Sequence, residues 1–155
     1  MPFQIHALPA AQFAPLFTLD DTALAARNAR RMTVNEHPGV PCRVSLADAE
    51  VGETVLLVNH CHLDVASPYR AFHAIYVRET AVQAQPPRGA VPDVLQRRLI
   101  SLRGFDTDGM MVVAEVLEGT ALADALPKVF DDRSVDVVHL HYAKPGCYAA
   151  RVTRT

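Results

Sequence analysis

The C-terminal sequence VDVVHLHYAKPGCYAARV, residues 135–152, gives the clearest indication of the fold. Two apolar runs flank the loop AKPG, residues 143–146, whose Pro-Gly step is typical of a turn. Apolar runs on either side of such a turn predict a β-hairpin, because the two runs can pair across it. We therefore expect two neighbouring antiparallel strands at the C-terminal end of the chain.

The register of this hairpin determines which side chains share a face. An even loop pairs His141 with Tyr148 and Leu140 with Ala149, because no residue is left over on either strand. Cys147 then faces away from the histidines of the preceding strand. A cysteine–histidine pair within this hairpin would need a bulge or an odd loop.

The rest of the chain alternates extended runs with turn signals. Further strands are expected at residues 2–8, 42–46, 53–60, 71–78, 99–103 and 110–117. Short helices are expected from Asp20 or Asp21 to Arg31 and from an N-cap at Thr120, with Pro127 kinking or restarting the second. The total is about seven strands and two or three short helices, so we predict an α+β fold with a mainly antiparallel sheet. The order of elements leaves open whether this sheet curls into a barrel.

Composition bounds the size and setting of the protein. The 155 residues are 50% hydrophobic and 21% charged with a net charge of −2, which predicts a single globular domain over residues 1–155. The near-neutral charge argues against a nucleic-acid binder, which would carry a strongly basic face. Three cysteines without a Cys-x-x-Cys pair, no signal-peptide pattern and no long apolar run predict a cytoplasmic protein without a membrane partner. Thirteen arginines against two lysines are typical of a GC-rich bacterial genome.

Two His-x-His pairs support the leading functional hypothesis. His60 and His62 follow an apolar strand, and His139 and His141 lie in the C-terminal hairpin. Residues two apart on a strand point to the same face, so each pair presents two imidazoles side by side. Because imidazole binds Zn, Fe, Cu or Ni well, the four histidines predict a divalent transition-metal site if the pairs meet, with Asp64 as a further ligand. In the alternative interpretation each pair is solvated or hydrogen-bonded to backbone.

Cysteine and arginine residues form a second candidate site. Arg43 follows Cys42, and a cysteine nucleophile needs a nearby histidine or positive charge to lower its pKa. Cys42, Arg43, Tyr69 and Cys147 are the predicted ligand-binding residues. Adjacent strand residues point to opposite faces, however, so buried cysteines that act as small apolar side chains are the competing interpretation.

A set of short motifs from about residue 41 to the C-terminal end belongs together. The set comprises Pro41-Cys42-Arg43, Gly52-Glu53, Ser67-Pro68-Tyr69, the Arg103–Gly109 hairpin, Gly119, and Gly146-Cys147-Tyr148 with Arg151 and Arg154. In these motifs the chain resembles a bacterial family known as domain of unknown function twelve-hundred-and-three. The resemblance implies a compact domain and brings no activity with it.

Three functional classes stay open from the sequence. The histidine pairs favour a small-molecule or metal-binding domain, with enzymatic activity left open. A non-enzymatic interaction or accessory module, including a homo-oligomer, would instead associate through a strand edge or apolar surface. A nucleic-acid binder is the third class, against which the net charge argues. The sequence contains no GxGxxG, Walker, GxSxG or HExxH motif, so the common nucleotide-binding, serine-hydrolase and zincin signatures are absent.

Overall fold

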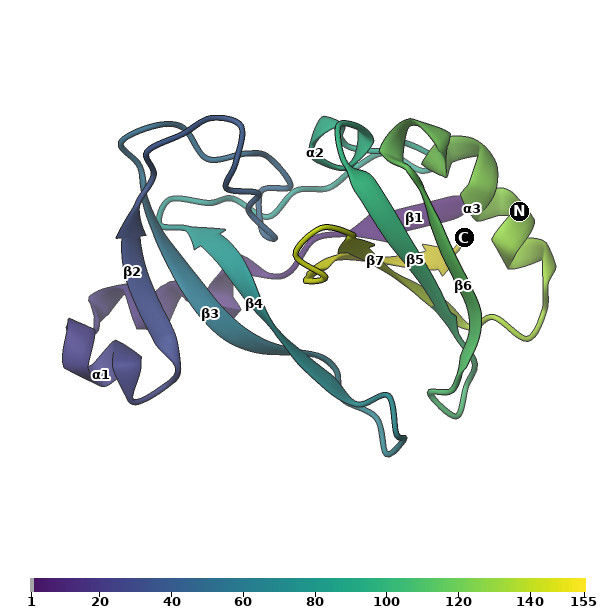
Figure 1. The fold of residues 1–155 in the computed structure, drawn as a ribbon, viewed down its shortest axis with the longest axis horizontal. Coiled ribbons are helices and arrows are strands. Elements are labelled where there is room, and N and C mark those ends of the chain that lie inside the picture. The colour runs from purple at the N-terminus through teal and green to yellow at the C-terminus, as the bar shows by residue number, and fades with distance from the viewer. Residues whose placement is uncertain (1) are drawn as a thin grey trace.

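The computed structural model describes residues 2–155 and arranges them in two antiparallel sheets (Figure 1). The larger sheet has the strand order β1-β8-β7-β5-β6, and the smaller has the order β2-β3-β4. The strands are β1 (Phe3–His6), β2 (Ala29–Thr33), β3 (Thr54–Leu63), β4 (Ala71–Arg78), β5 (Leu99–Phe105), β6 (Met111–Glu118), β7 (Val137–Tyr142) and β8 (Tyr148–Arg154). Both sheets are open, so the strands that the structure describes form no closed barrel.

Short helices fill the connections between strands. They are the 3-10 helices η1 (Ala10–Gln12), η2 (Ala14–Thr18) and η3 (Gly119–Ala121), and the α-helices α1 (Asp21–Ala25), α2 (Asp93–Gln96) and α3 (Leu122–Asp131). Helix α3 buries Leu122, Leu126 and Phe130, which lie four residues apart on one face, in the core of the larger sheet. The predicted α+β class with antiparallel pairing is confirmed. No helix within residues 2–155 is long and apolar enough to cross a membrane.

The predicted C-terminal hairpin is formed by β7 and β8, and β7 lies between β5 and β8 in the larger sheet. The expected pairing of His141 with Tyr148 is confirmed. The expected pairing of Leu140 with Ala149 is wrong, because a bulge shifts the register and places Leu140 opposite Ala150. The bulge thus lies beside His141, between the turn and the rest of the hairpin.

Two expectations for the N-terminal half are wrong. Residues 42–46 form a turn instead of a strand: the backbone N–H of Cys42 donates to the Ala47 carbonyl at 3.0 Å, and Leu46 adopts a φ of 49°. The first helix ends at Ala25, not Arg31, and Ala29–Thr33 forms β2 at the edge of the smaller sheet.

The last helix also departs from expectation at its start. Thr120 lies in η3, and Ala121 at the N-cap of α3 makes no side-chain capping bond. Helix α3 then continues past Pro127 to Asp131, so the proline does not restart it.

The two sheets meet along the C-terminal hairpin. Tyr148 at the start of β8 packs into the core of the smaller sheet, which also contains Leu56 and Ile75. Figure 1 shows the β3–β4 hairpin reaching down toward the β5–β6 hairpin, and the Ser67 hydroxyl donates to the Gly109 carbonyl at 2.8 Å between their turns. Inward side chains of β3 and β4 therefore face those of β7.

Candidate metal site

Histidines from both sheets converge where the sheets face each other. His62 comes from β3, His73 from β4 and His141 from β7, and one ring nitrogen from each lies within 4.8 Å of the other two. The rings of His62 and His73 stack at 4.7 Å between centroids, with an interplanar angle of 11°. The ring of His141 stands edge-on to both, at 4.9 and 5.0 Å.

Strand pairing explains why these side chains meet. In the β3–β4 hairpin His60 lies opposite His73, so both side chains project from the same face of the smaller sheet. His62 lies two residues beyond His60 and keeps that face, although a register shift follows between Cys61 and Leu63. On β7 the same two-residue period directs His139 and His141 together toward the smaller sheet.

Hydrogen bonding leaves one buried nitrogen of each clustered imidazole free. His141 donates from Nδ1 to the Gly146 carbonyl at 3.0 Å, and the Nδ1 atoms of His62 and His139 lie 2.8 Å apart, so one donates to the other. Within residues 2–155, the buried ring nitrogens without a partner are His62 Nε2, His73 Nδ1 and His141 Nε2. Each therefore offers a lone pair if its proton is on the other nitrogen.

Burial keeps these imidazoles neutral. Loss of solvent, followed by the charge of His141, lowers the pKa of His62 to about 2. Loss of solvent also lowers the pKa of His141 to about 3 and of His139 to about 4, and Arg103 contributes to both shifts. At neutral pH no proton competes for the free nitrogens, which is the state a metal ligand needs.

An aromatic wall closes one side of the cluster. Tyr148 is 2% exposed and stacks on His62 at 5.1 Å, with an interplanar angle of 17°. Its ring also meets His139 edge-on at 5.2 Å. Because the rings hold one another in place, the imidazoles are positioned before any ligand arrives.

Three of the four predicted metal ligands reach the cluster. His62 and His141 contribute free nitrogens, and His139 lies behind them as the hydrogen-bond partner of His62. His60 lies to one side, with its ring 5.9 Å from that of Phe13. Asp64 is exposed, forms an ion pair with Arg70 at 3.0 Å and does not belong to the group of three.

The sequence reasoning missed His73, because it searched for paired histidines and His73 has no neighbouring partner. A signal for it was present. The turn at residues 67–68 joins two predicted strands, and closing that hairpin places residue 73 opposite residues 60–62.

The predicted ligand-binding set divides between three places. Arg43 is 1% exposed and donates from Nη2 to Cys147 Sγ at 2.9 Å, so these two residues share a site. Cys42 is buried in the core of the smaller sheet, where its sulfur accepts from the backbone N–H of Arg78 at 3.4 Å. Tyr69 packs edge-on against Phe105 at 6.1 Å and is not among the residues that line the place shared by Arg43 and Cys147.

The fold and the site together define an antiparallel α+β domain with buried, neutral imidazoles between its two sheets. The chain belongs to the family described as "Protein of unknown function (DUF1203)", which matches residues 39–154. The matched range contains β3, β4 and β7, and with them His62, His73 and His141. The comparison with curated proteins gave no match, and neither did the comparison with solved structures.

Proposed function

We propose that this protein binds a divalent transition-metal ion through His62, His73 and His141. One observation carries the proposal: three imidazoles from three strands each present a buried nitrogen without a hydrogen-bond partner, and one ring nitrogen from each of the three lies within 4.8 Å of the others. Leaving buried polar atoms unpaired is costly, and a bound ion would satisfy all three at once.

The spacing is compatible with a metal after a small movement. Three nitrogens no more than 4.8 Å apart lie at most about 2.8 Å from a common centre, whereas zinc–imidazole bonds are about 2.0–2.1 Å long. Each nitrogen would therefore move inward by at most about 0.7 Å to reach that bond length, a shift that ring rotation can supply. Imidazole-only ligation favours Zn, Cu or Ni over Mg or Ca, which prefer oxygen ligands.

The outer hydrogen bonds suit metal ligation. A ligating imidazole commonly donates its second N–H to a carbonyl or another acceptor, which orients the ring and makes the ligand more basic. His141 has such a bond to Gly146, and His62 has one available toward His139. Three protein ligands leave a further coordination position open, as in zinc sites that hold water or a small ligand.

Metal binding is tested with untagged protein that has been treated with a chelator and then titrated with Zn²⁺ or Ni²⁺ by calorimetry. We expect one equivalent to bind. An ion at 100 times its Kd stabilises the fold by about 2.7 kcal/mol. For a domain of this size that raises Tm by roughly 5–10 °C.

Matched variants separate this site from adventitious binding by surface histidines. His73→Gln and His141→Gln should each weaken binding by at least about tenfold, the lower end of what losing even an outer partner of a ligand costs. His60→Gln is the control, because His60 shares a strand and a face with His62 but lies outside the group of three. Equal affinity in all three variants, or no stoichiometric binding to the wild type, would refute the proposal and leave the cluster as aromatic packing.

A further inference from the structure

A second site lies on the other side of the C-terminal hairpin. A cavity of about 430 Å³ opens there between the loop at residues 39–43, the start of β5 and the β7–β8 turn. The polar side chains that line it belong to Arg43, Arg97, Arg98, Tyr142, Lys144 and Cys147. The volume falls within the range of about 300–1,000 Å³ that is usual for small-molecule sites.

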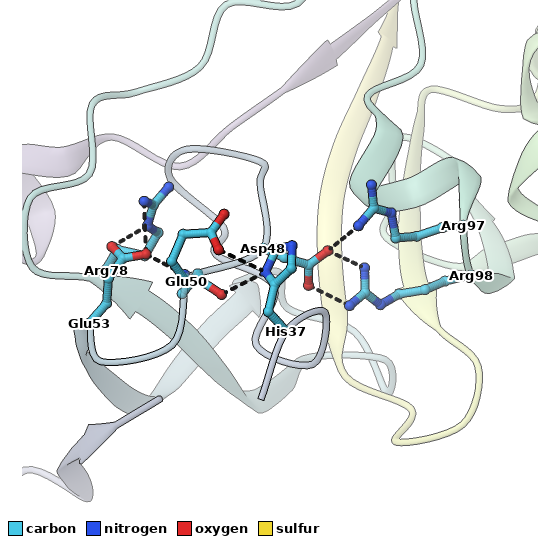
Figure 2. Close-up of polar contacts among 8 residues, drawn as sticks. His37, Asp48, Glu50, Glu53, Arg78, Arg97 and Arg98 are labelled. Atoms are coloured by element: carbon cyan, nitrogen blue, oxygen red, sulfur yellow. Dashed lines mark hydrogen bonds and ion pairs between the residues drawn. The ribbon is translucent and has the colours of Figure 1, made fainter. Parts of the chain in front are cut away.

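Positive charge dominates this cavity. Four of its lining residues are cations, and none of them is acidic. Asp48 does not line the cavity, and its side chain is only 1% exposed. Its carboxylate forms ion pairs with Arg98 at 2.5 Å and with Arg97 at 3.3 Å (Figure 2). This contact holds the two guanidinium groups in place but offsets only one of their charges, and Arg43 and Lys144 add further positive charge.

Arg43 is buried without a counter-ion. Its Nε donates to the Tyr148 carbonyl at 2.7 Å, Nη1 to the Pro41 carbonyl at 2.5 Å and Nη2 to the sulfur of Cys147 at 2.9 Å. Arg43 is only 1% exposed, and no carboxylate within residues 2–155 forms an ion pair with its guanidinium group. A buried cation is costly unless an opposite charge lies close by, so the cavity has a place for an anion.

Tyr142 provides an independent indication of a ligand. Its side chain lines the cavity, the residue is 3% exposed, and its hydroxyl is buried without a hydrogen-bond partner. The guanidinium carbons of Arg43 and Arg98 lie 5.0 and 5.2 Å from its ring centroid. The unpartnered hydroxyl of Tyr142 can donate a hydrogen bond to an acceptor in the cavity.

We propose that this cavity binds a small organic anion, with a carboxylate or phosphate head and an apolar or aromatic body. The head meets Arg43, Lys144 and the hydroxyl of Tyr142, which supply charge and a directed hydrogen bond. The body lies against Tyr76, Leu99 and Pro145, which form the apolar wall. This site uses none of the clustered histidines, so it stands whether or not a metal binds.

Equilibrium binding tests the proposal with simple probes. Benzoate and phenyl phosphate are titrated into the protein by calorimetry, with benzyl alcohol as the uncharged counterpart. We expect saturable binding of at least one anion, at least tenfold tighter than benzyl alcohol and weaker as salt is raised. The tighter of the two anions identifies the head group. Benzyl alcohol binding as well as either anion, or no saturable binding of the anions, would overturn the proposal.

Two mild variants locate the binding. Lys144→Gln removes an exposed charge, and Tyr142→Phe removes only the unpartnered hydroxyl, so both should fold. Each is expected to raise the Kd of the anion at least fivefold. Lys128→Gln on α3 is the matched control, because it removes the other lysine of the chain without touching this cavity. Unchanged affinity in both cavity variants would also overturn the proposal.

Cys147 offers a second, chemically different readout. Its thiolate displaces iodide from either iodoacetate or iodoacetamide: a C–S bond forms, a C–I bond breaks and the thiol proton leaves to solvent. A positive cavity raises the local concentration of the anionic reagent, so the iodoacetate-to-iodoacetamide rate ratio at Cys147 should exceed that at Cys61 by about tenfold. Both cysteines are partly exposed, which makes Cys61 an internal reference.

The iodoacetate-to-iodoacetamide rate ratio at Cys147 should fall in Lys144→Gln. The tighter-binding of the two probe anions should slow alkylation of Cys147 but not of Cys61. Both rates follow from peptide mass spectrometry of one sample. Equal reagent ratios at the two cysteines, together with no protection by the anion, would contradict the inference.

Discussion

Acid should lower the free energy of unfolding of this protein steeply, beginning just below about pH 6.5, where imidazoles of the unfolded chain take up protons. His139 and His141 are 3% and 0% exposed, and burial lowers their pKa values to about 4 and about 3. The unfolded chain has ordinary imidazoles, with pKa values near 6.5. Below about pH 6.5 the unfolded state therefore takes up protons that the folded state refuses, and the free energy of unfolding falls until the pH reaches the folded pKa values.

The size of the effect follows from the two shifts. Each imidazole contributes a slope of about 1.4 kcal/mol per pH unit between its folded and unfolded pKa values. Lowering the pH from 7 to 5 should therefore cost about 2 kcal/mol for each residue, or about 4 kcal/mol together. Domains are typically stable by about 5–15 kcal/mol, so this is a large fraction of the total. His62, whose pKa is also lowered, acts in the same direction.

Urea denaturation at several pH values, with a chelator present, measures this dependence. Replacing His141 by Leu removes one titrating group and should lower the slope by about 1.4 kcal/mol per pH unit. Ile100→Val is the control, because it costs about 0.5–1.5 kcal/mol in the core but leaves every imidazole in place, so its slope should match the wild type. A wild-type stability that is flat between pH 7 and 5, or a His141→Leu slope equal to the wild type, would refute the reasoning.

Three further outcomes are expected from urea denaturation at pH 7. Gly119→Ala should cost more than about 3 kcal/mol or prevent folding, because its Cβ would lie 1.8 Å from the Leu95 carbonyl oxygen; a stable variant would show that the backbone there can shift. Asp48→Ala should cost about 2–3 kcal/mol, because it leaves two arginines without their shared carboxylate; a neutral result would mean that solvent replaces it. Phe130→Ala should cost about 3–5 kcal/mol through the cavity it leaves under α3, and a loss below 1 kcal/mol would contradict the packing.

The strands and the C-terminal hairpin could largely be predicted from local sequence patterns, because tertiary contacts do not change the structure of those segments. The loop at residues 143–146 specifies the β7–β8 hairpin and its pairing near the turn, because the loop length sets the register there. The bulge beyond His141 was not predictable. The extra residue, Ala149, lies on β8, and the apolar pattern of one strand does not show which residue will be left unpaired.

The errors have physical causes as well. Ala29–Thr33 contains two arginines and no apolar alternation, so only its pairing with β3 marks it as a strand. Residues 42–46 carry the apolar pattern of a strand but form a turn. The reason is that their backbone bonds go to Ala47 and, at some distance along the chain, to Tyr76. Propensity describes an isolated segment, whereas these two segments take their structure from their partners.

The sequence could predict that histidines on strands would come together, but not which histidines would form the group. The two-residue period correctly placed His139 and His141 on one face of β7. No sequence pattern, however, indicates which strands of the smaller sheet lie opposite that face. His73 belongs to the group of three and His60 does not, although these two residues lie opposite each other in the β3–β4 hairpin; the register shift between Cys61 and Leu63 lies at His62.

The same period explains how one strand can serve two sites. On β7, His141 points toward the imidazoles between the sheets, and the next residue, Tyr142, points to the opposite face, where it lines the basic cavity. Across the turn, Cys147 and Tyr148 divide in the same way: the sulfur meets Arg43 in the cavity, and the Tyr148 ring stacks on His62. The two sites are thus opposite faces of a single hairpin, joined by the bond from His141 to Gly146 and the bond from Arg43 to the Tyr148 carbonyl. A change in the turn that displaced either bond would move residues of both sites, whereas a side-chain change on one face would leave the other face in place.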